Sequence, residues 1–327
     1  MLLRRPGWGR VALGAVARVI WYLFGVPCAW SLPRGAEREG ARWGTSGDGE
    51  DALRHDDDRD ASSPHASRVD ALRRAFALAG AADVSHVAGA FDEHLADVSR
   101  VLKAWGLPEH VALAGYAHTL YGSELFPVAM GSFSNAARRA ARRVIGRDAE
   151  HLVFLYGTCS QRQWYRSVLD SALDDVVDET SDAEWRVPEQ VNAYTGQRAR
   201  LSKTRFAFLC AVHAADVAST LPSCIRREES SSRGIFREKS ASDFAARVFV
   251  SRLLRVAAAA IRDADVDARR RFPGLERALL RAANDAGPFS ETGNSTKWRS
   301  LERAEVTRLR RCAFDAWLVA RATGLVA

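Results

Sequence analysis

The sequence contains few cysteines, very little lysine and none of the short glycine-rich motifs that mark common nucleotide-binding sites. No P-loop, dinucleotide fingerprint, protein-kinase motif set or nucleophile elbow occurs in the 327 residues. The five cysteines form no CxxC pair, so a zinc ribbon and a thioredoxin-like redox site are not expected. Scattered cysteines of this kind favour reduced thiols that pack as small apolar side chains.

Acidic residues are missing from the first 35 positions, and this absence accounts for most of the net positive charge. Five of the 47 basic residues lie there, which leaves 42 basic against 40 acidic residues in the remainder. A body with an excess of only about two positive charges has no net field strong enough to indicate nucleic-acid binding. No stripe of alternating basic and aromatic residues indicates a stacking platform either. Nucleic acid is therefore not an expected partner.

Residues 1–35 have the composition of a targeting or membrane-associated segment. A basic start precedes an apolar stretch, VALGAVARVIWYLFGVPCAW, which Arg18 interrupts. A secretory signal and an organelle transit peptide both fit this pattern, whereas an uncleaved anchor would place Arg18 near the middle of the bilayer. We therefore expect the segment to contact a membrane or the import machinery, and the protein to enter an organelle or the secretory pathway.

Composition also divides the rest of the chain. Residues 36–67 are rich in Gly, Ser and Asp and have hardly any branched apolar side chains, so they are expected to form a disordered linker. A helical domain is predicted over 68–222, a polar loop over 223–242 and a helical extension over 243–327. No spacing decides whether this extension completes the first core or forms an oligomer interface, so the oligomeric state is left open.

A stripe of apolar residues on a predicted helix places one histidine in the core. In HVAGAFDEHLADVSRVLKAW, apolar side chains recur at 3.6-residue spacing from Val87 to Leu102. His94 follows Phe91 by three residues and is therefore expected to point inward. Gly106 is placed to end this helix.

The next predicted helix carries a second inward-facing histidine. It begins near Pro108 and places Val111, Gly115 and His118 on one face, and its small residues allow a close approach to neighbouring helices. Imidazole is a preferred ligand of transition metals. His94 and His118 therefore indicate either a metal site or two neutral imidazoles that form hydrogen bonds within the core.

The segment EHLADVSRVLKAWGLPEHVALAGYAHTLYG resembles the first metal-binding half of phosphohydrolases of the histidine-aspartate (HD) superfamily, especially the alarmone-hydrolase type. Those domains open with a histidine and an apolar helix, continue through a Gly-Leu turn and end an alanine-rich helix in His-Asp. The order WG.P, AG..H and YG.E is also similar to a family of uncharacterised plant, algal and bacterial domains, and this second resemblance is the closer one. The resemblance implies an all-α, HD-like helical bundle in which His94 and His118 are metal ligands.

The resemblance further implies a carboxylate on a later helix. LSKTRFAFLCAVHAADVASTL places Phe206, Leu209, His213 and Asp216 on one helical face. Asp216 matches the closing aspartate of the superfamily and is the predicted third ligand. His213 is a candidate fourth ligand or a group that orients Asp216.

One departure from the superfamily pattern concerns catalysis. Thr119 occupies the position of the aspartate that would bridge metal and water, and a threonine does not ionise near neutral pH. Glu124 is the candidate general base in its place. A glutamate that follows Gly122 and Ser123 equally fits a helix-capping role.

An arginine-rich helix supplies the candidate phosphate contact. In SFSNAARRAARRVIGR, Arg138 and Arg142 lie four residues apart and share one helical face. They are predicted to bind the substrate, with a solvated basic face as the alternative interpretation.

Three hypotheses on function follow from these residues and the resemblance. The first is a metal-dependent phosphohydrolase for a phosphorylated small molecule or nucleotide, with Mn, Fe or Zn bound by His94, His118 and Asp216. The second is a catalytically inactive HD-like scaffold or ligand-binding module. The third is a non-haem iron oxygenase, because two imidazoles and one carboxylate leave coordination positions open for dioxygen.

Overall fold

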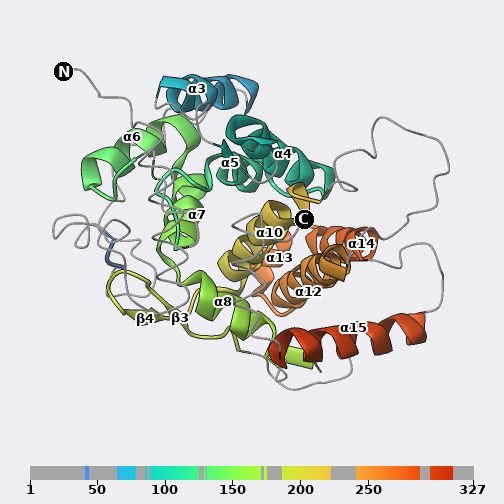
Figure 1. Cartoon of the computed structure of the whole chain (residues 1–327). Helices are drawn as coiled ribbons and strands as arrows, with labels where there is room; N and C mark the ends of the chain where they lie inside the picture. Colours follow the sequence, from blue (N-terminus) through green and yellow to red (C-terminus); the bar gives the residue numbers. More distant parts are fainter. Residues whose placement is uncertain are drawn as a thin grey trace.

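Helix α10 (Lys203–Ser219) forms the centre of the structure because nearly all of its side chains are apolar or small and become buried. Ser202 caps its start, since the hydroxyl accepts a hydrogen bond from the backbone N–H of Arg205. A helix that is apolar on every side must be covered on every side. In the computed structural model other helices surround α10 (Figure 1), and the all-α prediction is confirmed.

The elements have the following bounds. The structure describes residues 41–43, 65–78, 85–86, 89–124, 129, 131–170, 173–174, 186–221, 241–287 and 295–311. The helices besides α10 are α3 (His65–Leu78), α4 (Phe91–Ala104), α5 (Glu109–Ala117), α6 (Asn135–Ile145), α7 (Arg147–Thr158), α8 (Gln161–Val168), α12 (Ala241–Arg262), α13 (Val266–Arg271), α14 (Leu275–Ala286) and α15 (Ser295–Arg311). Two short antiparallel pairs join β1 (Ser85–His86) to β2 (Gly89–Ala90) and β3 (Gln190–Val191) to β4 (Arg198–Ala199).

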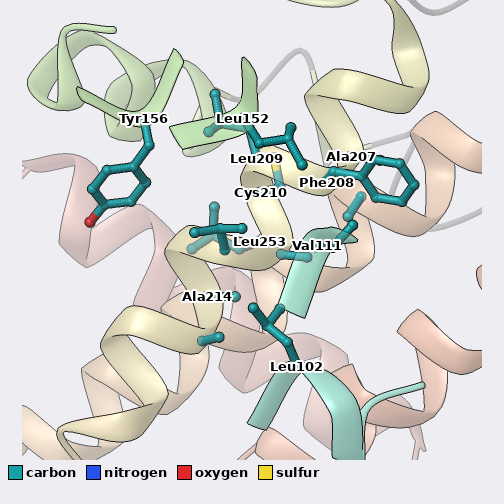
Figure 2. Close-up of a cluster of buried hydrophobic side chains, with 14 of the residues drawn as sticks. Leu102, Val111, Leu152, Tyr156, Ala207, Phe208, Leu209, Cys210, Ala214 and Leu253 are labelled. Atoms are coloured by element: carbon teal, nitrogen blue, oxygen red, sulfur yellow. The ribbon is translucent and has the colours of Figure 1, made fainter. Parts of the chain in front are cut away.

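Helices α4, α5, α7 and α12 all pack on α10, and α12 shares with it the most extensive helix–helix contact in the described part of the chain. Figure 2 shows the apolar side chains that meet there, with Leu102 from α4, Val111 from α5, Leu152 from α7, Leu209 from α10 and Leu253 from α12. Burial of these side chains is the main driving force that holds the five helices together.

The C-terminal helices belong to this same core. Helix α14 packs along α12, and α15 also contacts α12. One continuous cluster of buried apolar residues extends from α3 and α4 through α10 to α14 and α15. The described part of the predicted helical extension therefore completes the first core.

The connection between α4 and α5 has the geometry that the sequence predicts. Gly106 adopts a left-handed φ of 78°, which ends α4, and Pro108 is the N-cap residue of α5. The two helices lie so close that a Cβ atom at Gly115 would stand 2.3 Å from a methyl carbon of Leu102. The close approach expected from the small residues of α5 is confirmed.

The start of α4 differs from the prediction. The apolar stripe extends the helical pattern back to residue 86, but residues 85–90 contain the β1–β2 hairpin and the helix begins at Phe91. Gly89 lies in this part of the pattern, and glycine is an unfavourable helix residue. Helices α8 and α13 were not predicted because six to eight residues are too few to show a periodicity.

Residues 41–43, which fall inside the predicted linker, pack against the core instead. The side-chain amide of Asn192 donates to the carbonyl of Ala41 (2.7 Å), and the indole N–H of Trp43 donates to the hydroxyl of Thr158 (3.0 Å). These partners lie 151 and 115 positions later in the chain. The linker prediction is wrong for these three residues because their local composition carries no sign of such distant partners. It is also wrong for residues 65–67, which form the start of α3.

Several predictions fall on other parts of the chain. The targeting segment 1–35, the linker residues 36–40 and 44–64 and the loop residues 223–240 lie outside the described residues. The last two residues of the predicted loop, 241–242, belong to α12 instead. Among the residues that are described, no helix is both long enough and apolar enough to cross a membrane.

The packing of Trp43 generates a prediction on stability. The Trp43→Ala variant loses a side chain that is only 7% exposed, so we expect the free energy of unfolding to fall by about 3 kcal/mol. Leu78→Ala is the matched control, because Leu78 is 85% exposed and its loss should change stability by less than about 0.5 kcal/mol. Chemical denaturation of the full chain measures both values. Equal, small changes would contradict the packing of residues 41–43 on the core.

Candidate metal centre

Two histidines and one aspartate from different parts of the chain meet beside α10. His94 lies near the start of α4, His118 directly follows α5, and Asp216 lies in the last turn of α10. Because α4 and α5 both pack on α10, one ligand atom from each residue falls within 4.8 Å of the other two. The structure therefore brings together the three residues that the sequence and the resemblance predicted as ligands.

The three converging atoms are spaced as donors to one cation. The Nε2 atom of His94 lies 3.2 Å from Oδ1 of Asp216, and Nε2 of His118 lies 3.6 Å from the same oxygen. Donors that bind one cation at about 2.1 Å lie roughly 3.0–3.4 Å from each other in tetrahedral or octahedral geometry. The first distance falls within this range and the second slightly beyond it, and two imidazoles with one carboxylate are a donor set that suits a divalent metal ion.

Hydrogen bonds on the far side of each ring decide which nitrogen carries the proton. Nδ1 of His118 lies 2.7 Å from the carbonyl of Gly115, which can only accept, so Nδ1 is the donor. The hydroxyl of Ser219 donates to the carbonyl of Asp216 (2.8 Å) and lies 3.0 Å from Nδ1 of His94, so this Nδ1 is also assigned as a donor. In the neutral form of each ring, Nε2 then directs its lone pair at the aspartate.

Electrostatics at the centre favour a cation between these atoms. Burial lowers the pKa of His118 to about 4, although the charge of Asp216 opposes this shift. Burial alone would raise the pKa of Asp216, but His94, His118 and Tyr156 hold it far below its usual range. At neutral pH Asp216 is therefore an anion beside a neutral His118, and this combination favours a cation at the centre.

Tyr156 is a residue of this centre that the sequence analysis missed. Its hydroxyl donates to Oδ2 of Asp216 (2.6 Å), and its ring packs against His118 with centroids 5.0 Å apart. Figure 2 shows the ring of Tyr156 at the edge of the apolar cluster, with its hydroxyl directed away from the other labelled side chains. Burial raises the pKa of Tyr156, so the hydroxyl keeps its proton and holds Oδ2. Tyr156 precedes Asp216 by 60 positions, and no motif links them.

The centre is exposed to solvent on the side of Asp216. The Asp216 side chain is 23% exposed, whereas the side chains of His94 and His118 are 1% and 2% exposed. A small ligand can therefore approach Asp216 while the two imidazoles stay fixed by the core. Such an arrangement is typical of a site with protein ligands on one side and an open position on the other.

His213 lies behind this centre and is not one of the three converging groups. Its ring stacks on Tyr156 with centroids 4.4 Å apart, and its Nδ1 lies 3.2 Å from the hydroxyl of Tyr165. Burial lowers the pKa of His213 to about 3. A neutral His213 therefore supports the ring of Tyr156, which in turn holds Asp216.

Thr119, at the position where the HD resemblance leads us to expect an aspartate, is buried next to His118. Within the described part of the chain its hydroxyl has no hydrogen-bond partner. A buried hydroxyl without a partner is unfavourable by about 1–3 kcal/mol. The Thr119 hydroxyl therefore lowers the stability of the fold at the position next to the ligand His118.

Glu124, the predicted general base, accepts hydrogen bonds at the start of α8. Its Oε2 lies 3.1 Å from the hydroxyl of Ser160 and 3.1 Å from the backbone nitrogen of Arg162. Burial raises its pKa, although these hydrogen bonds oppose the shift. These hydrogen bonds cap α8, 36 and 38 positions later in the chain, whereas the capping alternative concerned a helix start beside Gly122 and Ser123. The catalytic role of Glu124 stays a prediction.

Arg138 and Arg142, the predicted substrate contacts, both bind the buried carboxylate of Glu150. Nε of Arg138 lies 2.7 Å from Oε1, and Nε of Arg142 lies 2.8 Å from Oε2. Tyr121 also donates to Oε1 (2.9 Å). This network joins α6 to α7. The sequence analysis did not predict it, because Glu150 lies 12 and 8 positions after the two arginines and on a different helix. Substrate binding by the two arginines stays a prediction.

Comparison with known protein families gives a match over the helices that carry the two histidines. Residues 75–161 match a family described as a domain of unknown function, DUF6817. This range includes His94, His118 and Tyr156, but it ends before α10 and Asp216. No curated protein and no solved structure gives a significant match. The match thus covers two of the three converging ligands.

The Glu150 network generates a prediction on pH dependence. Burial would raise the pKa of Glu150, but Arg138 and Arg142 lower it below its usual range. Its ionised form therefore stabilises the fold above the unfolded-state pKa of about 4.3, and this contribution is lost as the pH falls further. We expect Glu150→Gln to lower the free energy of unfolding by about 3 kcal/mol at neutral pH and by much less in acid.

Denaturation curves at several pH values test this expectation. Glu189→Gln is the control, since Glu189 forms an exposed ion pair with Arg198 and should have no measurable effect. A loss of stability in Glu150→Gln that does not change with pH would contradict the role given to its charge.

Proposed function

We propose that this chain is a divalent-metal-binding protein with an HD-like centre, and that the centre serves the hydrolysis of a phosphorylated small molecule or nucleotide. The observation that carries the proposal is the convergence of His94 Nε2, His118 Nε2 and Asp216 Oδ1, with both imidazoles held in the form that directs a lone pair inward. Two histidines from consecutive helices and an aspartate from a later helix also agree with the HD resemblance.

The chemistry assigned to each residue follows from its contacts. A bound Mn, Fe or Zn ion supplies Lewis acidity toward a phosphoryl oxygen or a water molecule. His94 and His118 are held rigidly by Ser219 and Gly115, and Tyr156 fixes Asp216, which keeps the donor set in place. The exposed side of Asp216 is the direction from which a substrate enters.

Thr119 supports a second candidate, the inactive scaffold or ligand-binding module. The side chain beside His118 is a hydroxyl rather than the carboxylate of the superfamily pattern, and Glu124 is engaged at α8. Under this candidate the imidazoles and Asp216 serve the stability of the core alone. The iron-oxygenase hypothesis uses the same donor set, and the identity of the metal separates it from hydrolysis.

Elemental analysis of the full chain, expressed without a metal-binding tag, tests the proposal. We expect about one equivalent of Mn, Fe or Zn and a melting temperature that falls after treatment with a chelator. The variants His118→Ala and Asp216→Ala should each lose the metal and keep their helical circular dichroism. His110→Ala is the matched control, because His110 also lies on α5 but outside the centre, and it should keep the metal.

The outcomes of this experiment separate the candidates. Full metal content in both ligand variants would contradict the proposed centre. Absence of metal from the parent protein, with a melting curve that a chelator does not change, would favour the scaffold. Iron as the bound metal would direct activity assays toward oxidation, and zinc or manganese toward phosphoester hydrolysis.

The position of Thr119 generates a separate prediction. Thr119→Asp restores the carboxylate of the HD pattern, but it adds a second buried negative charge, next to the ligand His118. Without metal the variant should be less stable than the parent by roughly 3 kcal/mol, because an unpaired buried charge is unfavourable. With Mn or Zn it should gain more stability than the parent does.

Thermal unfolding in chelator and in excess metal measures this difference. Thr220→Asp is the control, since Thr220 follows α10 and lies only four positions from Asp216, outside the group of converging ligands. An equal response to metal in the parent and in Thr119→Asp would contradict the HD-like placement of Thr119.

A further inference from the structure

A cavity of about 490 Å³ lies at the N-terminal ends of α7 and α10. Its walls come from α6, α7, α10 and α13, together with residues 41–43. Cavities of this size hold ligands the size of a small organic molecule.

Among the residues that the structure describes, the lining of this cavity carries an excess of positive charge. Six arginines line it, namely Arg42, Arg138, Arg142, Arg147, Arg205 and Arg271. Three carboxylates line it as well, of which Asp148 pairs with Arg271 and Asp265 caps α13. When Glu150 is counted against Arg138 and Arg142, six positive charges still face four negative ones. The arginine cavity, as we call this site, is therefore suited to an anion.

His151 and two helix starts also belong to this site. Its imidazole lines the cavity, and burial first and the charge of Arg205 next lower its pKa to about 3. The starts of α7 and α10 add to this potential, because helix N-termini carry partial positive charge and exposed backbone N–H groups. Thr204, in the first turn of α10, contributes a hydroxyl to the same wall.

The remaining lining is apolar and partly aromatic. Trp43, Phe208 and Phe272 contribute rings, and Leu152 and Leu155 contribute aliphatic surface. Inorganic phosphate alone would leave most of this surface without a partner. A ligand with an anionic head group on an aromatic or aliphatic body fits both parts of the lining.

The arginine cavity is separate from the metal centre. None of His94, His118 and Asp216 lines it. Arg205 and Asp216 stand 11 positions apart on α10, which corresponds to about 16 Å along the helix axis. The two sites therefore use opposite ends of the same buried helix.

We propose that the arginine cavity is a second binding site, which takes a small organic anion with a phosphate-like or carboxylate head group and an aromatic or aliphatic body. The head group lies toward the arginines at the starts of α7 and α10, and the body lies against the ring of Trp43 and the apolar side chains. This site goes beyond the proposed hydrolysis and does not depend on a metal.

Isothermal titration of the full chain with 1-naphthalenesulfonate tests the proposal, because this anion has an aromatic body and cannot be hydrolysed as a phosphoester. We expect a single site with Kd below about 1 mM at low salt. Arg205→Gln and Arg42→Gln should each raise Kd at least about fivefold. Arg100→Gln, on α4 in an exposed pair with Asp97, is the matched control and should bind as the parent does.

Two further ligands measure how much the head group and the body each contribute to the affinity of the probe. The neutral analogue 1-naphthalenemethanol and methanesulfonate, which lacks the ring, should each bind at least about tenfold more weakly than the full probe. Any one of three results would overturn the proposal. The neutral analogue could bind as tightly as the probe, the parent and both arginine variants could have equal Kd values, or millimolar probe could give no binding heat. Because Arg42 is exposed, its variant folds even if the loss of Arg205 disturbs α10.

The same titration separates this inference from the proposed function. Chelator-treated protein and the Asp216→Ala variant should bind the probe with the Kd of the parent. If the parent protein as purified, without chelator, holds no metal but binds the probe, the metal centre alone is refuted. Probe binding that disappears with the metal would refute the separation of the two sites.

Discussion

The burial of α10 is the constraint on which the rest of the structure depends. Because this helix is apolar on nearly every side, α4, α5, α7 and α12 must cover it. The few polar side chains that α10 carries into this interior then need partners from those helices. His213 finds aromatic neighbours on α7 and α8, and Asp216 finds two imidazoles and a phenol. The candidate centre therefore results from the packing of these helices around α10.

Two carboxylates near the core show how differently a buried negative charge can be satisfied. Glu150 receives two guanidinium groups, which carry permanent positive charge, so its site is complete with protein groups alone. Asp216 receives a neutral phenol on one oxygen and the lone-pair sides of His94 and His118 on the other. The first arrangement stabilises the fold, and the second favours a cation. This contrast distinguishes a structural ion pair from a candidate binding site within one molecule.

Helix α7 forms a wall between the two sites. Tyr156 faces the aspartate at the end of α10, and His151, little more than one turn earlier, lines the arginine cavity. The DUF6817 match covers α7 together with α4, α5 and α6, but it does not reach α10. The matched segment therefore supplies two ligands and one wall of the cavity. The later helix α10 supplies the third ligand and further lining residues of the cavity, so both sites form only when the two segments pack together.

Much of the fold was predictable because helices leave a local signature. The sequence by itself determined the all-α class, the inward direction of His94 and His118 and the helical face that holds Asp216, since each follows from spacing within one helix. Only the tertiary structure decided that Tyr156 holds Asp216 and that Trp43 joins the core, because these contacts connect positions 60 and 115 residues apart. Local periodicity sets which way a side chain points, whereas packing between distant segments sets what it meets.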